Sequence, residues 1–187
     1  FPLRSGVAFH DGGELTADDV VATFTRIIDP PEGMVSVMRS LFRSVESVEA
    51  LDPLTVRFNF SVPQADFLTV MAAPFSVVYP KRVLDENNQD LRAVVAPGTG
   101  PFIFEEYQEG ERWILSRNPN YWNPELPYVD RMEMLNVPAW SDRGTAILTD
   151  QADLSWNVSV ETFEAAESRD DVAGKKVPST GAYTVII

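Results

Sequence analysis

The sequence predicts an α+β fold built mainly from antiparallel hairpins, and three observations lead to it. Apolar residues recur at helical spacing over 17–28, which is typical of a helix with one buried stripe. Residues 54–60 alternate apolar and polar side chains, as a half-buried antiparallel strand does. A glycine- and proline-rich corner at 97–102 then precedes two strand-like runs on either side of a Glu-Gly-Glu turn at 109–111. The two glycines of the corner permit backbone angles that are closed to other residues.

In the first half of the chain, residues 3–9 alternate in character, which predicts a short strand ending in an Asp-Gly-Gly turn. Thr16 and Asp19 are spaced as in a capping box, so the helix is expected to begin directly after Thr16. The next expected elements are a helical or irregular segment at 34–42, a hairpin of 43–50 and 54–60, a helix at 63–71 packing Phe67, Leu68 and Met71, and an extended piece at 75–81 followed by a polar segment.

In the second half, the corner leads into a hairpin over 102–118. Ser159 is expected to cap a helix that ends near Ser168, with Glu161 placed favourably in its first turn. The remaining expected elements are a strand at 132–137, a helix at 140–149, a strand at 152–156 and extended pieces at 175–177 and 182–187.

Composition narrows the classes of function. The chain has 187 residues, of which 44% are hydrophobic, and a formal net charge of −13, so an extended nucleic-acid surface is not expected. There is no cysteine, which excludes disulfides, zinc–thiolate sites and cysteine nucleophiles. No apolar run reaches the length of about 18 residues that a membrane span needs. No signal peptide precedes Phe1, and both ends resemble the middle of an element, so the chain is interpreted as an internal fragment of a longer protein.

Candidate catalytic and metal-binding groups are sparse. His10 is the single histidine, and no G-x-S-x-G motif accompanies it, so a Ser-His-Asp site is not expected. Paired acids occur at 18–19, 105–106 and 170–171. Adjacent acids point apart and are expected to be solvated, whereas acid–base catalysis needs two carboxylates held across a cleft. We therefore expect no catalytic residue, no metal site and no cofactor.

Several motifs follow one another in a specific order. They lie at 3–12, 15–20, 97–102, 117–122, 127–133, 146–148 and 151–154. Together they resemble the extracytoplasmic solute-binding proteins of ABC transporters, in the family that carries peptides, dipeptides and nickel.

The resemblance implies a type II periplasmic-binding-protein fold, in which two lobes close on a ligand. Residues 1–96 would form a small accessory lobe, incomplete at its N-terminal side, and 97–187 would form part of the first main lobe up to a hinge strand. The implied function is capture of oligopeptides or dipeptides in the periplasm or outside the cell, and delivery to the membrane subunits of an ABC permease. The family implies binding without catalysis, and any lipid anchor would lie outside this fragment.

The resemblance also implies ligand-binding residues. Trp156 and Asn157 stand where a strand ends and a helix begins, a position suited to side chains that face a cleft. Val158 follows, at a place that is polar in some relatives. In the small lobe, the segment after the first helix offers Met38 and Phe42. A second interpretation of Trp156, as a core residue, stays open.

Alternative functions also remain. Within the family, the cargo could be an oligosaccharide, a nickel complex, an opine or a haem-like molecule. Outside it, the chain could be a glycosidase-like enzyme using two of its carboxylates, or a ligand-sensing module. Flanking sequence would separate these: a lipobox signal peptide favours the transporter protein, and a transmembrane helix with a kinase favours the sensor.

Overall fold

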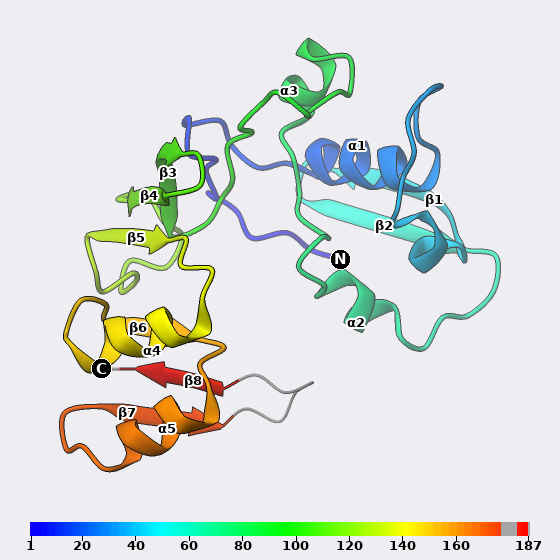
Figure 1. Ribbon diagram of the computed structural model, residues 1–187. Helices are drawn as coiled ribbons and strands as arrows, with labels where there is room; N and C mark the ends of the chain where they lie inside the picture. Colours follow the sequence, from blue (N-terminus) through cyan, green and yellow to red (C-terminus); the bar gives the residue numbers. More distant parts are fainter. Residues whose placement is uncertain (177–182, 187) are drawn as a thin grey trace. The chain divides into compact units, whose positions relative to one another are not determined.

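The computed structural model describes residues 1–176 and 183–186, and the chain divides into two compact units (Figure 1). The first unit comprises residues 1–105 and 115–132, and the second comprises 106–114 and 133–187. The lobes expected at 1–96 and 97–187 stay a prediction.

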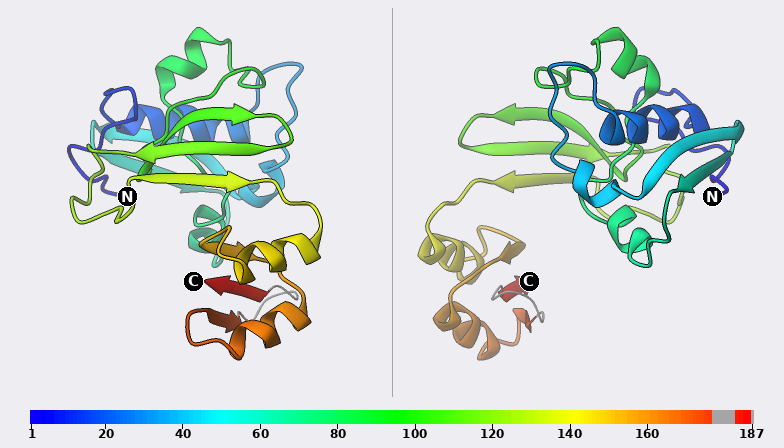
Figure 2. Two further views of the ribbon diagram at one scale, coloured as in Figure 1. Left: turned by 60° about the vertical axis from the view of Figure 1, so that its left-hand side comes forward. Right: turned by 90° about the vertical axis from the view of Figure 1, so that its right-hand side faces the viewer.

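The first unit is built on a helix and a hairpin. Helix α1 (Ala17–Ile28) packs along the antiparallel hairpin of β1 (Val45–Asp52) and β2 (Thr55–Phe60), as Figures 1 and 2 show. At its start, the Asp19 carboxylate accepts hydrogen bonds from the backbone N–H of Thr16 at 2.8 Å and from its hydroxyl at 3.0 Å. The helix, its start and the hairpin confirm the sequence prediction.

An aromatic cluster fills the core of the first unit. Phe42 ends the 3₁₀ helix η1 (Arg39–Phe42), and its ring centroid lies 5.4 Å from that of Phe24 on α1. Helix α2 (Phe67–Met71) is shorter than predicted and buries Phe67 and Val70. The expectation that Leu68 packs inward is wrong, since this side chain is 66% exposed.

Helix α3 (Lys81–Glu86) is an element that the sequence analysis missed. It is a short, mostly charged stretch with only Val83 and Leu84 buried, too short for a periodic signal. A distant residue secures its first turn: Asp19 accepts a hydrogen bond from the Lys81 backbone N–H at 2.7 Å. Asp19 is 7% exposed, so the expectation that both acids at 18–19 are solvated is wrong for this one.

The first residues do not form the predicted strand at 3–9. Isolated bridges join Pro2 to Thr55 and Ala8 to Glu14, and Gly6 lies between them with a φ of +70°. A residue in this left-handed region interrupts the extended backbone that continuous alternation requires. The alternating pattern therefore reflects two separate contacts.

A three-stranded sheet follows, with the order β3-β4-β5 (Figure 2). Its strands are β3 (Phe102–Gln108), β4 (Arg112–Arg117) and β5 (Arg131–Leu135). The predicted hairpin turn is confirmed, and Gly110 adopts a φ of +75° within it.

The corner before β3 is held by hydrogen bonds. The carbonyl oxygen of Gly100 lies 3.0 Å from the His10 Nε2 atom and accepts a hydrogen bond from the Asn118 side-chain amide at 2.9 Å. The His10 backbone N–H donates to the carbonyl of Gly98 at 2.8 Å. Neither glycine of the corner has a positive φ, so the expectation of special backbone angles there is wrong. His10 has a structural position at this corner.

The second unit contains two helices and a small sheet. Helices α4 (Trp140–Leu148) and α5 (Val160–Glu167) accompany β6 (Leu154–Trp156), β7 (Ala173–Lys176) and β8 (Tyr183–Ile186). The strand order is β6-β8-β7, and both pairs are antiparallel. The core comprises Ile147, Val158, Phe163, Ala166 and Val172. The predicted elements are confirmed within the described residues, whereas Val177, Ala182 and Ile187 lie outside them.

Candidate ligand-binding site

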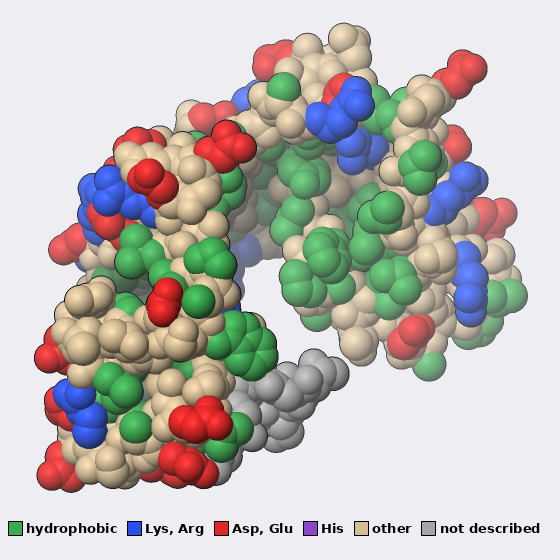
Figure 3. Space-filling view, in the orientation of Figure 1, with side chains coloured by type: hydrophobic (Ala, Val, Ile, Leu, Met, Phe, Trp, Pro, Cys, Tyr) green, Lys and Arg blue, Asp and Glu red, His purple; other side chains and the backbone are tan. Residues whose placement is uncertain are grey.

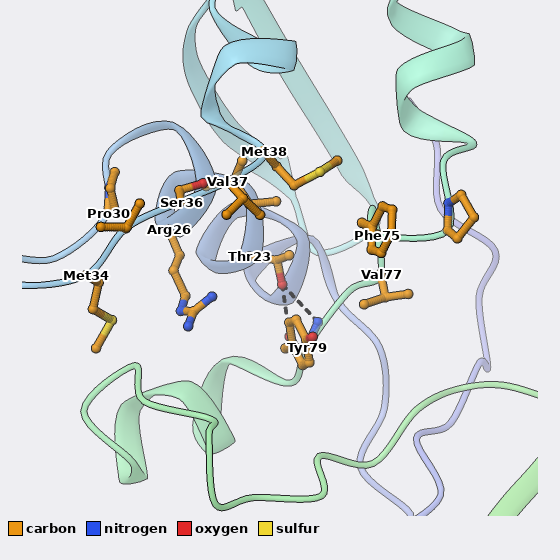
Figure 4. A pocket seen from close by; sticks show the side chains of 13 residues that line it. Thr23, Arg26, Pro30, Met34, Ser36, Val37, Met38, Phe75, Val77 and Tyr79 are labelled. Carbon is orange, nitrogen blue, oxygen red and sulfur yellow. Dashed lines mark hydrogen bonds between the residues drawn. The ribbon is translucent and has the colours of Figure 1, made fainter. Parts of the chain in front are cut away.

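A cavity of about 370 Å³ lies in the first unit (Figure 4). Three parts of the chain line it: the C-terminal half of α1 up to Pro30, the segment 34–38, and residues of the segment 74–79. Its size is at the lower end of the range of ligand pockets, about 300–1,000 Å³. This cavity is the main candidate for a ligand contact on the first unit.

Hydrogen bonds of Thr23 connect two walls of the cavity, helix α1 and the segment 74–79. Its hydroxyl oxygen accepts a hydrogen bond from the Tyr79 backbone N–H at 2.9 Å and donates to the Tyr79 carbonyl at 3.3 Å (Figure 4). Thr23 is 2% exposed. The segment 74–79 is therefore held against α1, although it contains no helix or strand.

The rim of the cavity is apolar and exposed. Val35 is 90% exposed, Val37 85% and Phe75 72%. Figure 3 shows hydrophobic side chains gathered on the face of the first unit that this view presents. Grouped exposed apolar side chains are typical of binding surfaces.

The two site residues predicted in the first unit have different surroundings. Met38 is half-buried and lines the cavity. Phe42 is 1% exposed and packs in the aromatic core against Phe24 and Phe67. Its side chain therefore supports the fold around the cavity.

The sequence analysis missed other residues of this cavity. Arg26, Phe75 and Tyr79 were not singled out, although all three line it. The available signal was an apolar segment without clear alternation, enclosed by Pro74 and Pro80.

The three site residues predicted in the second unit form a sharp turn. Trp156 ends β6 with 53% of its surface exposed, so its interpretation as a core residue is wrong. Asn157 is half-buried and has a φ of +60°, in the left-handed region that asparagine tolerates. Val158 is 1% exposed and belongs to the core of this unit. Ser159 then caps α5 by accepting a hydrogen bond from the Thr162 N–H at 3.2 Å.

The buried residue of this turn, Val158, fixes the position of the exposed residue before it, Trp156. The inward side chain of Val158 and the cap at Ser159 anchor the chain directly after Asn157. Trp156, at the end of β6, is exposed to solvent next to this anchored segment. An exposed aromatic ring suits contact with a ligand.

Metal and membrane sites were also considered. Within residues 1–176 and 183–186, no group of three or more His, Cys, Asp or Glu side chains is placed to hold a metal ion. Across the same part of the chain, every helix is too short or too polar to span a bilayer.

Known proteins resemble this chain in sequence. Di/tripeptide-binding protein 4 of Pseudomonas aeruginosa is 34% identical over an alignment covering 68% of this chain and 27% of that protein. The glutathione-binding protein GsiB of Escherichia coli is 24% identical, with 95% and 34% covered. The chain thus spans about a third or less of the length of these relatives.

Solved structures resemble the fold. The periplasmic binding protein DppA of Helicobacter pylori, solved with the peptide STSA, has a TM-score of 0.81 and 29% identity, covering 94% of this chain and 38% of that chain. A dipeptide-binding protein of Pseudoalteromonas, solved with Met-Leu, has a TM-score of 0.82 and 29% identity, with the same coverage. The agropinic acid complex of AgaA from Agrobacterium has a TM-score of 0.85 and 25% identity, covering 93% and 35%. The type II binding-protein fold expected from the motifs is therefore confirmed for this part of the protein.

The family follows from a match over the whole chain. The model of the middle region of the bacterial extracellular solute-binding proteins, family 5, matches residues 1–187. This agrees with the order of motifs in the sequence and with the fold of both units. The chain belongs to the family 5 bacterial extracellular solute-binding proteins.

Proposed function

We propose that this chain is part of the solute-binding component of an ABC importer that captures oligopeptides or dipeptides. The observation that carries the proposal is the family match over all 187 residues. Two relatives at 29% identity or more were solved with peptides bound, and a third is named for di- and tripeptides. The exposed apolar rim of the cavity on the first unit adds a suitable surface.

The wider setting is part of the same proposal. The complete protein works in the periplasm or outside the cell, with a lipid anchor in some hosts, and hands its ligand to the membrane subunits of a permease. It binds without catalysing a reaction. Ligand binding shifts the population from an open form to a closed one, because the ligand contacts more protein in the closed form.

We propose candidate contacts for each unit by itself. In the first, Met38 and the rim of the cavity meet apolar groups of the ligand. In the second, Trp156 offers an aromatic face and Asn157 a side-chain amide that can bind a peptide backbone. Phe42 and Val158 hold these surfaces in place from the cores below them.

A thermal-shift experiment on the complete protein tests the proposal. The panel would contain short peptides, oligosaccharides, nickel chelates and opines. A ligand at about a hundred times its Kd stabilises the folded state by about 2.7 kcal/mol, so peptides are expected to raise the melting temperature. A shift with sugars, opines or nickel complexes in place of peptides would contradict the peptide assignment, and turnover of a sugar substrate would contradict binding without catalysis.

The Trp156 contact can be tested separately. Trp156→Ala is expected to weaken peptide binding about tenfold or more, because an exposed aromatic anchor carries a large share of binding energy. Isothermal titration calorimetry would measure the Kd. Trp140→Ala is the matched control, since Trp140 is 56% exposed in the same unit and lies outside the turn. Equal affinity of the Trp156 variant and the wild type would contradict the assignment.

A further inference from the structure

A second hollow, a groove of about 320 Å³, lies on the first unit. Two short segments form its walls: residues 40–44 around the end of η1, and residues 62–66 in the loop between β2 and α2. None of the residues that line this groove also lines the candidate ligand cavity. It is therefore a separate surface feature, which we call the η1–α2 groove.

Hydrogen bonds hold the two walls of this groove together. The Ser44 carbonyl oxygen accepts hydrogen bonds from the Ser61 backbone N–H at 2.9 Å and from the Ser61 hydroxyl at 3.3 Å. The side-chain amide of Gln64 donates to the Leu41 carbonyl oxygen at 3.1 Å. The groove is thus formed before any partner binds, which lowers the entropic cost of association.

The groove carries two opposite charges that the fold does not use. Arg43 lies in one wall and Asp66 in the other, and both residues are exposed. Within residues 1–176 and 183–186, neither side chain takes part in a hydrogen bond or an ion pair. Asp66 stands at the N-cap of α2, but its side chain makes no capping bond. Both charges are therefore available to a partner.

Exposed apolar side chains belong to the same two walls. Leu41 is 43% exposed and Val62 is 56% exposed, and both line the groove together with Pro63 and Ala65. Gln64 adds unused hydrogen-bonding capacity, since its buried Oε1 atom has no partner in the part of the chain that the structure describes. Apolar contacts flanked by polar and charged groups are typical of protein interfaces. The groove therefore suits a protein surface better than a small ion.

The distribution of charge in the groove favours one kind of partner. In a dimer with twofold symmetry both copies use the same surface, so a residue i contacts a residue j of the other copy, and j contacts i. A free cation in one wall and a free anion in the other meet this condition. Because the formal net charge of the chain is −13, two copies repel each other in general, and association needs a surface on which the charges balance.

We propose that the η1–α2 groove binds the same groove of a second copy of this protein. Two Arg43–Asp66 ion pairs hold this twofold dimer, and Leu41 and Val62 pack at its centre. The proposal concerns assembly and goes beyond the proposed function, because it depends on neither the ligand nor the importer. A standard interface uses about 20–30 residues a side, more than these two segments provide, so the dimer is expected to be weak and to depend on concentration.

A charge swap tests the ion pairs. Sedimentation velocity of the complete protein would measure the dimer Kd over about a hundredfold range of concentration. Arg43→Asp and Asp66→Arg are each expected to raise the Kd about tenfold or more, because each brings like charges together at both symmetric contacts. The double variant is expected to restore the wild-type Kd, since both pairs form again with their signs exchanged. Arg39→Asp is the control, because it changes the net charge as Arg43→Asp does at an exposed residue outside the groove.

Cross-linking tests the symmetry. Residues 1–187 contain no cysteine, so one introduced thiol reports its own distance to the same residue of the other copy, once any cysteine elsewhere in the complete protein is replaced by serine. Val62→Cys is expected to give a disulfide-linked dimer under mild oxidation, because a residue near a twofold axis lies close to its own copy. Val95→Cys is the matched control, since Val95 is 65% exposed in the same unit and lies outside the groove.

Several results would overturn the dimer. They are a monomer at every concentration, single variants that associate as the wild type does, a double variant as weak as the single ones, and equal cross-linking of the two cysteine variants. A monomeric protein whose Arg43→Asp variant no longer binds the permease would assign the groove to that partner instead. If a single charge variant fails to fold, as its melting temperature would show, the double variant and Val62→Cys decide. Peptide binding by a monomer would leave the importer proposal standing, whereas a charge-dependent dimer without peptide binding would do the reverse.

Discussion

Phe42→Ala is expected to lower the unfolding free energy of the first unit by about 3–5 kcal/mol, the usual cost of removing a buried phenylalanine ring. The ring is 1% exposed and lies against Phe24 and Phe67. Its loss would leave a cavity between α1, η1 and α2. The destabilisation is comparable to half the stability of a small domain.

Hydrogen exchange of the β1 and β2 amides would measure this effect in the first unit. Met38→Ala is the control, because Met38 is half-buried and lines the cavity. It is expected to change stability much less and to weaken peptide binding more. If Phe42→Ala left the hydrogen-exchange protection unchanged and lowered the affinity for peptide, Phe42 would contact the ligand, as its position in the sequence suggested.

Gly144→Ala is expected to destabilise the second unit by about 1–3 kcal/mol, although alanine is the better helix former. Gly144 lies in α4, where a Cβ atom would come within 2.9 Å of the Thr162 Cγ2 and 3.1 Å of its Cβ. It would also collide with the Thr162 hydroxyl oxygen. At an exposed helix position, the same substitution would stabilise by about 1 kcal/mol, so the sign of the change is diagnostic.

A double-mutant cycle identifies the cause. Thr162→Ala removes the two closest atoms, the hydroxyl oxygen and Cγ2, and leaves the Cβ, so Gly144→Ala is expected to cost much less in that background. Denaturant unfolding followed by tryptophan fluorescence would report the change, since Trp140 and Trp156 both belong to this unit. Additive effects of the two substitutions would contradict close packing of α4 against α5 at this point.

These positions matter for binding because the two cores support the candidate contacts. Phe42 lies four residues after Met38 and is buried in the core of the first unit, whereas Met38 packs against that core and also lines the cavity. In the second unit, Val158 is the buried core residue directly after Trp156 and Asn157 and supports them in the same way. Loss of either core residue is therefore expected to weaken binding indirectly, through disorder of the surface above it.

Local patterns in the sequence were sufficient for most of the secondary structure. The stripe of α1, the alternation of β2, the turn at Gly110 and the cap at Ser159 were all predictable, because each depends on residues close together in the chain. The order of short motifs was sufficient to indicate the family. The turn at 156–159 was also predictable as a place where a strand gives way to a helix.

Only the tertiary structure decided which side chains face outward and where the cavity lies. Phe42 and Met38 are both apolar, and their spacing does not tell core from surface, because burial depends on contacts with distant elements. Helix α3 needed the carboxylate of Asp19 from far along the chain, and the cavity needed the bonds of Thr23 to Tyr79. The sequence by itself determined the family and the local elements, and long-range packing determined which residues are left for a ligand.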